Sequence, residues 1–191
     1  MNIALPKSVT VGEKQWRIRT DFRDVLQIIS AFNDPDVPKE EKALVCLVIL
    51  YPDFDRMPQR LYEEALQKAV LFIDMDSSSE KETPRVMDWE QDAGILFPAV
   101  NKVAGGEVRS MKYLHWWTFM GYCMAIDDGV FSQVLSLRMK RAKGKKLEKY
   151  EKEYWISNLD ICELRPKLSA EERKEKERRR EARSKIKDML K

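Results

Sequence analysis

The spacing of apolar residues after position 21 is the feature that most constrains the fold, because they recur every three to four positions in one segment after another. In the first such segment, Asp21 offers a side-chain oxygen to the free amides of a helical first turn. The apolar positions that follow lie on one helical side: Phe22, Val25, Leu26, Ile29 and Phe32. With only seven glycines and eight prolines in 191 residues, the sequence predicts a mainly α-helical protein.

A β pattern precedes the first helical segment. The stretch "SVTVGEKQWRIRT" alternates apolar and polar residues on both sides of Gly12 and Glu13. Val9 and Val11 come before this turn, and Trp16 and Ile18 come after it. Such alternation around a glycine-containing turn predicts an N-terminal β-hairpin.

Two more helices are predicted in the first half. Pro38 suits the first position of a helix over residues 38–51, whose acids lie near its positive end and whose interior is apolar on nearly every side. We therefore expect this helix to be buried all round. Its apolar run of nine residues stops at Pro52, well short of the roughly 20 residues that span a bilayer. Another helix should start at Pro58, with an apolar side of Leu61, Ala65, Ala69, Phe72 and Ile73.

The polar, serine-rich stretch "DMDSSSEKETP" at residues 74–84 has no apolar periodicity and is the clearest linker. We assign residues 1–75 to the hairpin and its helices, 76–85 to the linker, 86–168 to a C-terminal helical half and 169–191 to a charged tail. The first half is small for an independent domain, so both halves are expected to form one domain.

The second half predicts further helices. One covers residues 88–103, with a kink near Pro98 and an end at Gly105 and Gly106. Others cover residues 110–126, 130–142 and 147–161, the last after the basic break "KGKK". The expected fold is a bundle of about six to seven helices with an N-terminal β-hairpin and a long charged C-terminal helix.

The tail carries the chain's positive charge. Residues 169–191 contain ten Lys/Arg and six Asp/Glu, a net charge of +4 against +3 for the whole chain. Ser169 followed by Glu172 predicts a capping box, and acid-base pairs four residues apart predict a solvated helix. As partner-binding residues of this tail we assign Arg178, Arg179, Arg180, Arg183, Ile186 and Leu190.

The aromatic segment "YLHWWTFMGYC" contains the only histidine, His115. This histidine has no second histidine, no acid three or four residues away and no nucleophile in a known motif, so we expect a structural role with one ring nitrogen hydrogen-bonded. The neighbouring residues predict a broad apolar helix face that packs in the core: Tyr113, Trp116, Trp117, Met120 and Met124.

Other chemistry-bearing residues also have structural explanations. The acids Asp88, Glu90 and Asp92 would lie in the first turn of a helix, where the positive end of the dipole favours them. Cys46, Cys123 and Cys162 are far apart, odd in number and set among apolar residues, which predicts three reduced thiols. We therefore expect no enzymatic activity, no metal and no cofactor.

Basic clusters leave nucleic-acid binding open as an alternative. One cluster comprises Arg138, Lys140, Arg141, Lys143, Lys145 and Lys146, and the tail arginines form another. Phosphate binding requires unpaired positive charge on one face. Because most bases of the tail have an acid within one helical turn and no interleaved aromatic residue, the stronger expectation is a solvated or partner-docking helix.

Several long stretches resemble a family of small proteins from tailed bacteriophages and prophages of Gram-positive bacteria, the gene-product-fifteen family, encoded near the tape-measure gene. The strongest are "MDWEQDAGILFPAVNKV" and "MKYLHWWTFMGYCMAIDDGVFSQVLSLRMK", and the resemblance covers roughly residues 22–162. The residues that make this resemblance most specific are assigned to a family signature in the core: Asp88, Trp89, Asp92, His115, Trp116, Trp117, Phe119 and Arg138. Arg138 is expected at the end of its helix.

The resemblance implies a non-enzymatic tail-assembly chaperone. Such a protein would bind the tape-measure protein, keep its apolar stripe from aggregating and present it to the major tail protein as the tube polymerises. It would act in the host bacterial cytoplasm during assembly and be absent from the mature virion. A structural tail subunit and homo-oligomerisation stay open, and no membrane contact is expected.

Overall fold

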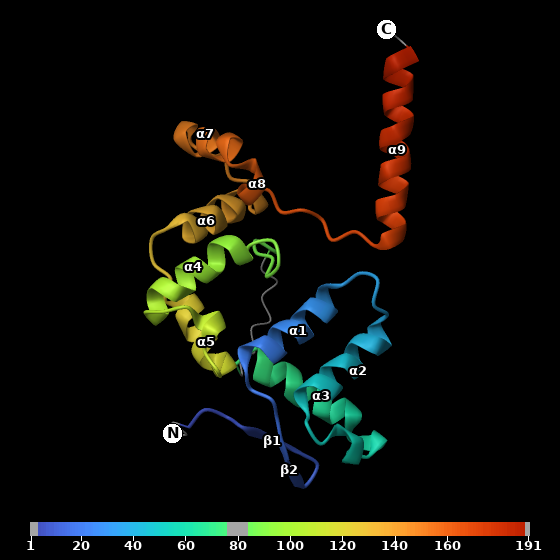
Figure 1. The fold of residues 1–191 in the computed structure, drawn as a ribbon, viewed down its shortest axis with the longest axis vertical. Helices are drawn as coiled ribbons and strands as arrows, with labels where there is room; N and C mark the ends of the chain where they lie inside the picture. The colour runs from blue at the N-terminus through green and yellow to red at the C-terminus, as the bar shows by residue number, and fades with distance from the viewer. Residues whose placement is uncertain (1–3, 76–83, 190–191) are drawn as a thin grey trace.

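The computed structural model describes residues 4–75 and 84–189, with side chains described as far as residue 182. Short 3-10 helices lie at Phe54–Arg56, Gln59–Leu61 and Val108–Ser110. The strands and α-helices are β1 (Ser8–Val11), β2 (Lys14–Arg17), α1 (Phe22–Asn33), α2 (Lys39–Leu50), α3 (Tyr62–Ile73), α4 (Ala93–Ala104), α5 (Trp116–Met124), α6 (Val130–Ala142), α7 (Lys149–Ser157), α8 (Leu159–Cys162) and α9 (Ala170–Met189). The prediction of a mainly α fold with an N-terminal hairpin is confirmed (Figure 1).

The hairpin forms with the predicted turn. Val9 pairs with Trp16 and Val11 with Lys14 in antiparallel register. Gly12 has a φ of 59°, a left-handed conformation that glycine adopts at no steric cost. Its backbone N–H donates to the carboxylate of Glu64 on α3 at 2.9 Å. The hairpin is therefore fastened to α3, with Val11 and Trp16 buried in the core.

Helices α1, α2 and α3 form the N-terminal part of the body (Figure 1). Asp21 caps α1 as predicted, accepting from the backbone N–H of Arg23 at 3.0 Å. The expectation that α2 is buried all round is wrong. Leu44 and Val48, one turn apart on the same side of α2, are each 47% exposed, whereas Cys46, Leu47 and Leu50 are buried. α2 packs against α1 and α3 on two sides and leaves this third side open.

The two halves of the chain share one main core. The ring of Phe22 on α1 stacks on that of Phe119 on α5, with centroids 4.5 Å apart. Trp116 on α5 and Leu96 on α4 are also buried in this cluster. Because the core takes residues from both sides of the 76–83 segment, the halves pack as one body. Residues 76–83, most of the predicted linker, lie outside the described residues.

Two helices of the second half begin later than predicted. α4 begins at Ala93, five residues after the expected start, because residues 89–92 form turns. α5 begins at Trp116, because residues before it run extended and His115 forms a β-bridge with Asp21. Before α5 the backbone makes long-range bonds, from Trp116 N–H to the Thr20 carbonyl and from Phe22 N–H to the Leu114 carbonyl. The turns before α4 are closed by local bonds to Asp88.

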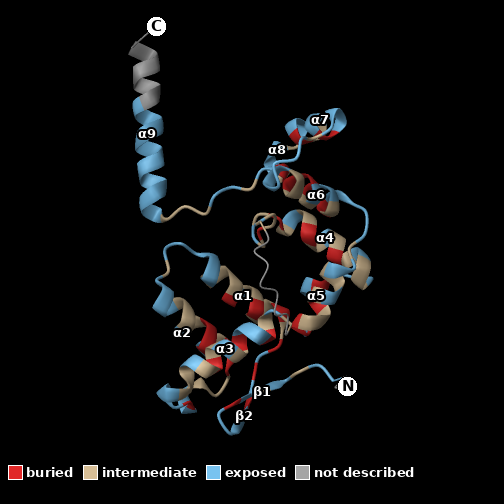
Figure 2. Ribbon diagram, turned by 180° about the vertical axis from the view of Figure 1, so that it is seen from behind, coloured by how far each residue is buried: buried red, intermediate tan, exposed pale blue. Residues whose placement is uncertain are grey.

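Helices α6, α7 and α8 form an arm at the end of the body opposite the hairpin, here called the C-terminal arm (Figures 1 and 2). Its own apolar cluster has four buried residues: Val134, Leu137, Trp155 and Cys162. α6 has the predicted bounds and continues four residues beyond Arg138. The helix predicted over residues 147–161 is divided at Asn158 into α7 and α8.

Helix α9 stands away from the rest of the molecule (Figure 1). Its predicted capping box is confirmed, since Glu172 N–H donates to Ser169 Oγ at 3.1 Å and Ser169 N–H donates to the Glu172 carboxylate at 2.8 Å. Asp36, in the α1–α2 loop, accepts from Ala170 N–H at 2.7 Å and pairs with Arg173 at 2.9 Å. The helix is thus attached at its start, while residues 170–182 are all exposed (Figure 2). In the described ranges, none of the helices combines the length and hydropathy of a membrane span.

Candidate partner-binding surfaces

Asp92 and Arg138, two residues of the family signature, form a buried ion pair between α4 and α6. The guanidinium donates to both carboxylate oxygens, at 2.7 and 2.8 Å, and the two side chains are 1% and 3% exposed. Arg138 also donates to the carbonyls of Val86, Ile161 and Cys162. This side chain therefore joins α4, α6, α8 and the segment before α4, in the bidentate geometry that favours arginine.

Asp88 organises the turns that precede α4. Its Oδ1 accepts from the N–H groups of Glu90 and Gln91 at 3.0 and 2.9 Å, and its carboxylate pairs with Arg85 and Lys167. Burial disfavours the charged form, but the hydrogen bond from Gln91, the charge of Lys167 and the bond from Arg85 outweigh it and lower the pKa of Asp88. The prediction that the acids at 88–92 lie in a helical first turn is wrong.

His115 is the N-cap of α5. Its Nδ1 accepts from the backbone N–H of Trp117 at 3.0 Å, and its Nε2 lies 2.9 Å from the carbonyl oxygen of Pro6. Because a carbonyl can only accept, the ring is the neutral tautomer with its proton on Nε2. Both ring nitrogens are used, and the side chain is buried. The geometry is that of a structural histidine.

Trp116 and Trp117 close the end of α3. Their indole N–H groups donate to the carbonyls of Ile73 and Phe72, each at 2.8 Å. These carbonyls belong to the last turn of α3, and the Phe72 carbonyl also accepts from the N–H of Met75 at 3.2 Å. The two tryptophans therefore join α5 to the first half of the chain by hydrogen bonds as well as by packing.

The other aromatic residues of the segment differ in burial. Phe119 is fully buried, and Trp89, half-buried, lies 5.9 Å from Trp116 between ring centroids. Tyr113 and Met124 are 52% and 67% exposed, so their assignment to a core-facing helix side is wrong. Tyr113 precedes α5 and its hydroxyl lies 2.7 Å from Thr20 Oγ1, while Met124 ends the helix where nothing covers it.

The basic cluster at residues 138–146 is not one face of free charge. Arg138 is buried in its ion pair, and the ammonium of Lys140 pairs with the Glu151 carboxylate. The guanidinium of Arg141 lies 4.3 Å from the centroid of the Trp155 ring. Half of the bases proposed for phosphate contact therefore already have intramolecular partners. Arg138 lies one helical turn after Val134, on the buried side of α6.

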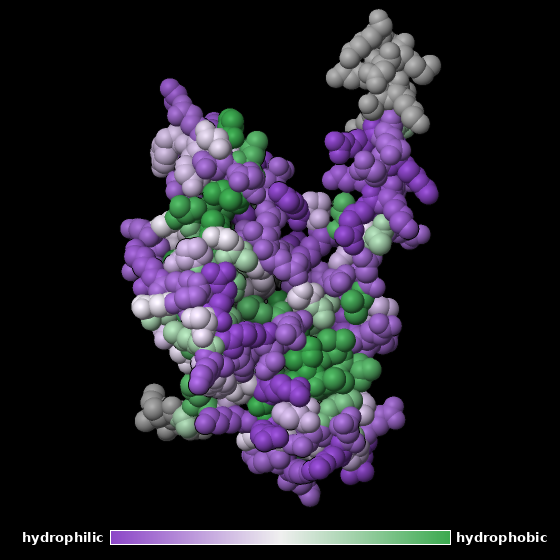
Figure 3. Space-filling model, in the orientation of Figure 1, coloured by the Kyte–Doolittle hydropathy of each residue, from purple (hydrophilic) through white to green (hydrophobic). Residues whose placement is uncertain are grey.

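Exposed apolar side chains lie on the helices of the first half, including α2, for which the sequence predicted burial. Leu44 and Val48 on α2 are joined by Phe32 at the end of α1, 40% exposed. Val70 and Leu71 on α3 are each 42% exposed. Figure 3 shows a continuous hydrophobic area over α1 and α2 and another over the C-terminal arm. We call Leu44 and Val48 the α2 strip.

The signature residues lie at the buried junctions of the fold, and a family model describing the bacteriophage Gp15 protein matches residues 1–164. The chain belongs to the bacteriophage Gp15 protein family. No curated protein and no solved structure was found to match it. The match extends beyond residues 22–162, the stretch on which the resemblance was recognised, and it includes the hairpin. Helix α9 lies outside it.

The tail of this Gp15-family chain carries the residues assigned to partner binding. Arg178, Arg179 and Arg180 are exposed on α9, and Arg179 pairs with Glu175 four residues earlier at 2.8 Å. The side chains of Arg183 and Ile186, and the whole of Leu190, lie outside the described residues. The arginines that are described face solvent along a helix joined to the body near Asp36.

The cysteines of this Gp15-family chain are unpaired. Burial raises the pKa of the Cys46 thiol to about 12, and it is also the main cause that raises the pKa of the Cys123 thiol to about 12. Thiols with such pKa values are poor nucleophiles at neutral pH, because the thiolate is the reactive form. Within the described ranges no group of three or more His, Cys, Asp or Glu side chains is arranged to hold a metal ion.

Proposed function

We propose that this protein is a non-enzymatic tail-assembly chaperone that binds the tape-measure protein while the phage tail tube forms. Membership of the bacteriophage Gp15 family supports a phage role. The α2 strip is the observation that carries the partner assignment, since two aliphatic side chains one turn apart remain 47% exposed on a helix whose other side, with Cys46, Leu47 and Leu50, is buried. An exposed apolar face of this kind is suited to the apolar stripe of a partner helix.

The size of this surface is consistent with reversible binding. Leu44 and Val48 are only half exposed, and the neighbouring Phe32 adds one more partly exposed ring. Little apolar area remains to be buried at one site, so the affinity per site should be moderate. Many copies along one tape-measure chain would still cover it, and each copy could leave as tail subunits arrive.

In this proposal the tail extends the same interface. Asp36 holds the start of α9 beside the α1–α2 loop, next to the helix that carries the α2 strip (Figure 1). At about 1.5 Å of rise per residue, residues 178–180 lie roughly 12–15 Å along α9 from Ala170. In this proposal the arginines at 178–180 and 183 contact acidic positions of the partner, and Ile186 and Leu190 add an apolar contact.

Co-expression with the tape-measure protein of the same phage, followed by affinity capture of the tagged chaperone, tests the proposal. We expect a soluble complex that the double variant Leu44→Glu/Val48→Glu no longer forms. Met124→Glu places one such carboxylate on a more exposed apolar residue of α5 and should leave capture unchanged. Failure to recover any soluble complex with the unaltered chain would reject the chaperone assignment.

A structural tail subunit is the competing assignment within the same family. Quantitative mass spectrometry of purified virions separates the two, because a chaperone that leaves during assembly should be absent from them. Recovery at the copy number of the major tail protein would replace the chaperone proposal with the structural one.

A further inference from the structure

The turn between α6 and α7 lies on the C-terminal arm, away from α2 (Figure 1). Side chains around this turn line a small groove. The groove encloses about 320 Å³. Gly144, with a φ of 67°, turns the chain after α6, and α7 then returns beside it. The residues that line the groove are Arg141, Lys145, Leu147, Lys152, Trp155 and Ile156.

The floor of the groove is apolar. Trp155 is 9% exposed and packs in the apolar cluster of the arm, and Leu147 packs against the same cluster. Ile156, the next residue along α7 after Trp155, is 69% exposed. Hydrophobic surface is visible over this part of the arm in Figure 3. An isoleucine this exposed beside a buried tryptophan offers a partner a specific apolar contact.

The walls of the groove carry positive charge without acidic partners. Arg141 contacts the Trp155 ring, and neither it nor Lys145 or Lys152 forms an ion pair with any described residue. Lys140, one residue from Arg141, is paired with Glu151, so acids are available nearby but are not directed into the groove. Residues 140–153 contain seven Lys/Arg and three Glu, a net charge of +4.

We infer that this groove docks an acidic amphipathic segment of a protein partner, with an apolar side chain against Leu147 and Ile156 and carboxylates on Lys145 and Lys152. The charges of such a segment complement both walls, and its apolar residue fills the floor. This inference requires no contact at the α2 strip and holds whether or not the partner is the tape-measure protein.

Nucleic acid fits this groove less well. The ring of Trp155 is buried and covered by Arg141, so it cannot stack on a base. The exposed Tyr150 is not among the lining residues.

Fluorescence anisotropy with the full-length protein tests the inference. The probes are a labelled amphipathic peptide of leucine and glutamate, the same peptide with lysine in place of glutamate, and a labelled single-stranded DNA. We expect the acidic peptide to bind more tightly than both other probes. Roughly tenfold weaker binding is expected for Lys145→Glu/Lys152→Glu, and a loss of several-fold for Ile156→Ser.

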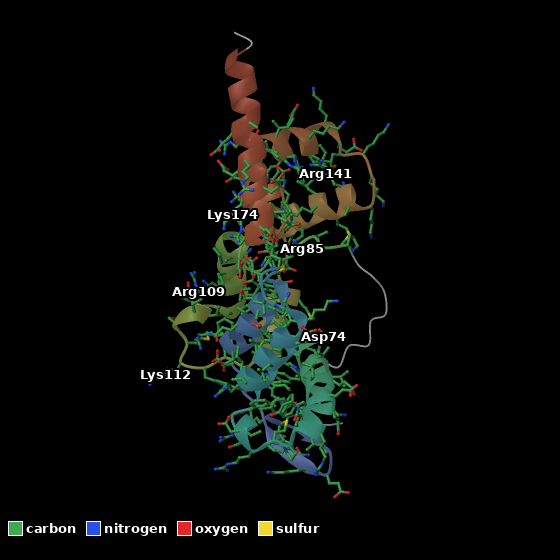
Figure 4. The ribbon with its side chains drawn as sticks, turned by 90° about the vertical axis from the view of Figure 1, so that its right-hand side faces the viewer. Asp74, Arg85, Arg109, Lys112, Arg141 and Lys174 are labelled. Atoms are coloured by element: carbon green, nitrogen blue, oxygen red, sulfur yellow. The ribbon has the colours of Figure 1, made fainter. Side chains whose placement is uncertain are left out.

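The double variant Lys112→Glu/Lys174→Glu is the matched control, because it changes the net charge equally at two exposed lysines. Both lysines lie away from Arg141 in Figure 4. Circular dichroism and urea unfolding establish that each variant is folded before binding is compared. Equal weakening by the control, equal binding of the basic peptide, or preference for DNA would each overturn the inference.

Discussion

The main core and the C-terminal arm are stabilised in different ways. The main core is an apolar cluster of residues from the hairpin, α1 to α5 and the intervening loops. The arm has four buried apolar residues of its own, and Arg138 supplements them with hydrogen bonds to Asp92 and three backbone carbonyls. Because the arm has few buried apolar side chains, its helices are held in place largely by the hydrogen bonds and the ion pair of Arg138.

This difference changes how mutations should act. In the main core, loss of one side chain leaves many other contacts, so the cost depends on the cavity that forms. In the arm, loss of one partner of the ion pair leaves a buried charge uncompensated. We therefore expect that replacing one polar residue of the arm lowers the free energy of unfolding as much as replacing a buried tryptophan of the main core.

The largest effect should come from Arg138→Met. Asp92 would stay buried without its partner, and three carbonyls would lose a donor, so the free energy of unfolding should fall by about 3–5 kcal/mol. Urea unfolding measures this loss. Arg179→Met, which breaks an exposed pair on α9, is the control and should cost roughly 0–1 kcal/mol. If Arg138→Met lowered the free energy of unfolding no more than the control does, the arm would not depend on its ion pair.

Trp116→Ala should cost a similar amount, about 3–5 kcal/mol, because the ring is fully buried and its N–H would no longer cap Ile73. Trp117→Ala should cost less, since that ring is only half-buried. Thermal and urea unfolding of the two variants provide the comparison. A Trp116→Ala protein that is equally stable but no longer captures its partner would show that this ring belongs to an interface.

His115→Ala should cost about 1–2 kcal/mol through loss of the α5 N-cap and of the bond to Pro6. Asn at this position retains an oxygen that can cap the helix, so His115→Asn should be the milder change. The ordering of the two urea midpoints is the measurement. Equal midpoints would mean that the cap contributes little and that ring packing sets the stability.

Asp88 should make the junction of body and arm sensitive to acid. Its pKa is lowered in the folded state, so the ionised carboxylate stabilises the fold above its unfolded pKa of about 3.9, and this stabilisation is lost as pH falls through the folded pKa. Asp88→Asn retains the acceptor for Glu90 and Gln91. We expect the wild-type urea midpoint to fall more steeply than that of the variant below about pH 4. Parallel pH profiles would contradict this role.

Deletion of residues 170–191 should have the smallest effect. The described side chains of α9 are exposed, and an ion pair and a hydrogen bond at Asp36 join residues 170–182 to the body. We expect a change below about 1 kcal/mol in the unfolding free energy of the remaining protein. Asp36→Asn in the full chain tests the attachment itself. A large loss on deletion would show that α9 contributes to the body's core.

Local sequence was sufficient for most of the secondary structure. The helical spacing after Asp21, the turn at Gly12 and the capping box at Ser169 each depend on residues within a few positions of one another, and each forms as predicted. The exceptions are also instructive. α5 starts late because His115 forms a β-bridge with the distant Asp21, and α4 starts late because residues 89–92 form turns instead of a regular helix.

By itself, the sequence determined the mainly helical class, the hairpin and the family, because these follow from periodicity, turn residues and motifs that lie close together along the chain. Only the tertiary structure decided that Arg138 forms an ion pair with Asp92, that His115 caps α5 and that Leu44 and Val48 remain exposed. The reason is physical: burial and ion pairing depend on which helices meet, and the pair at 92 and 138 is 46 residues apart.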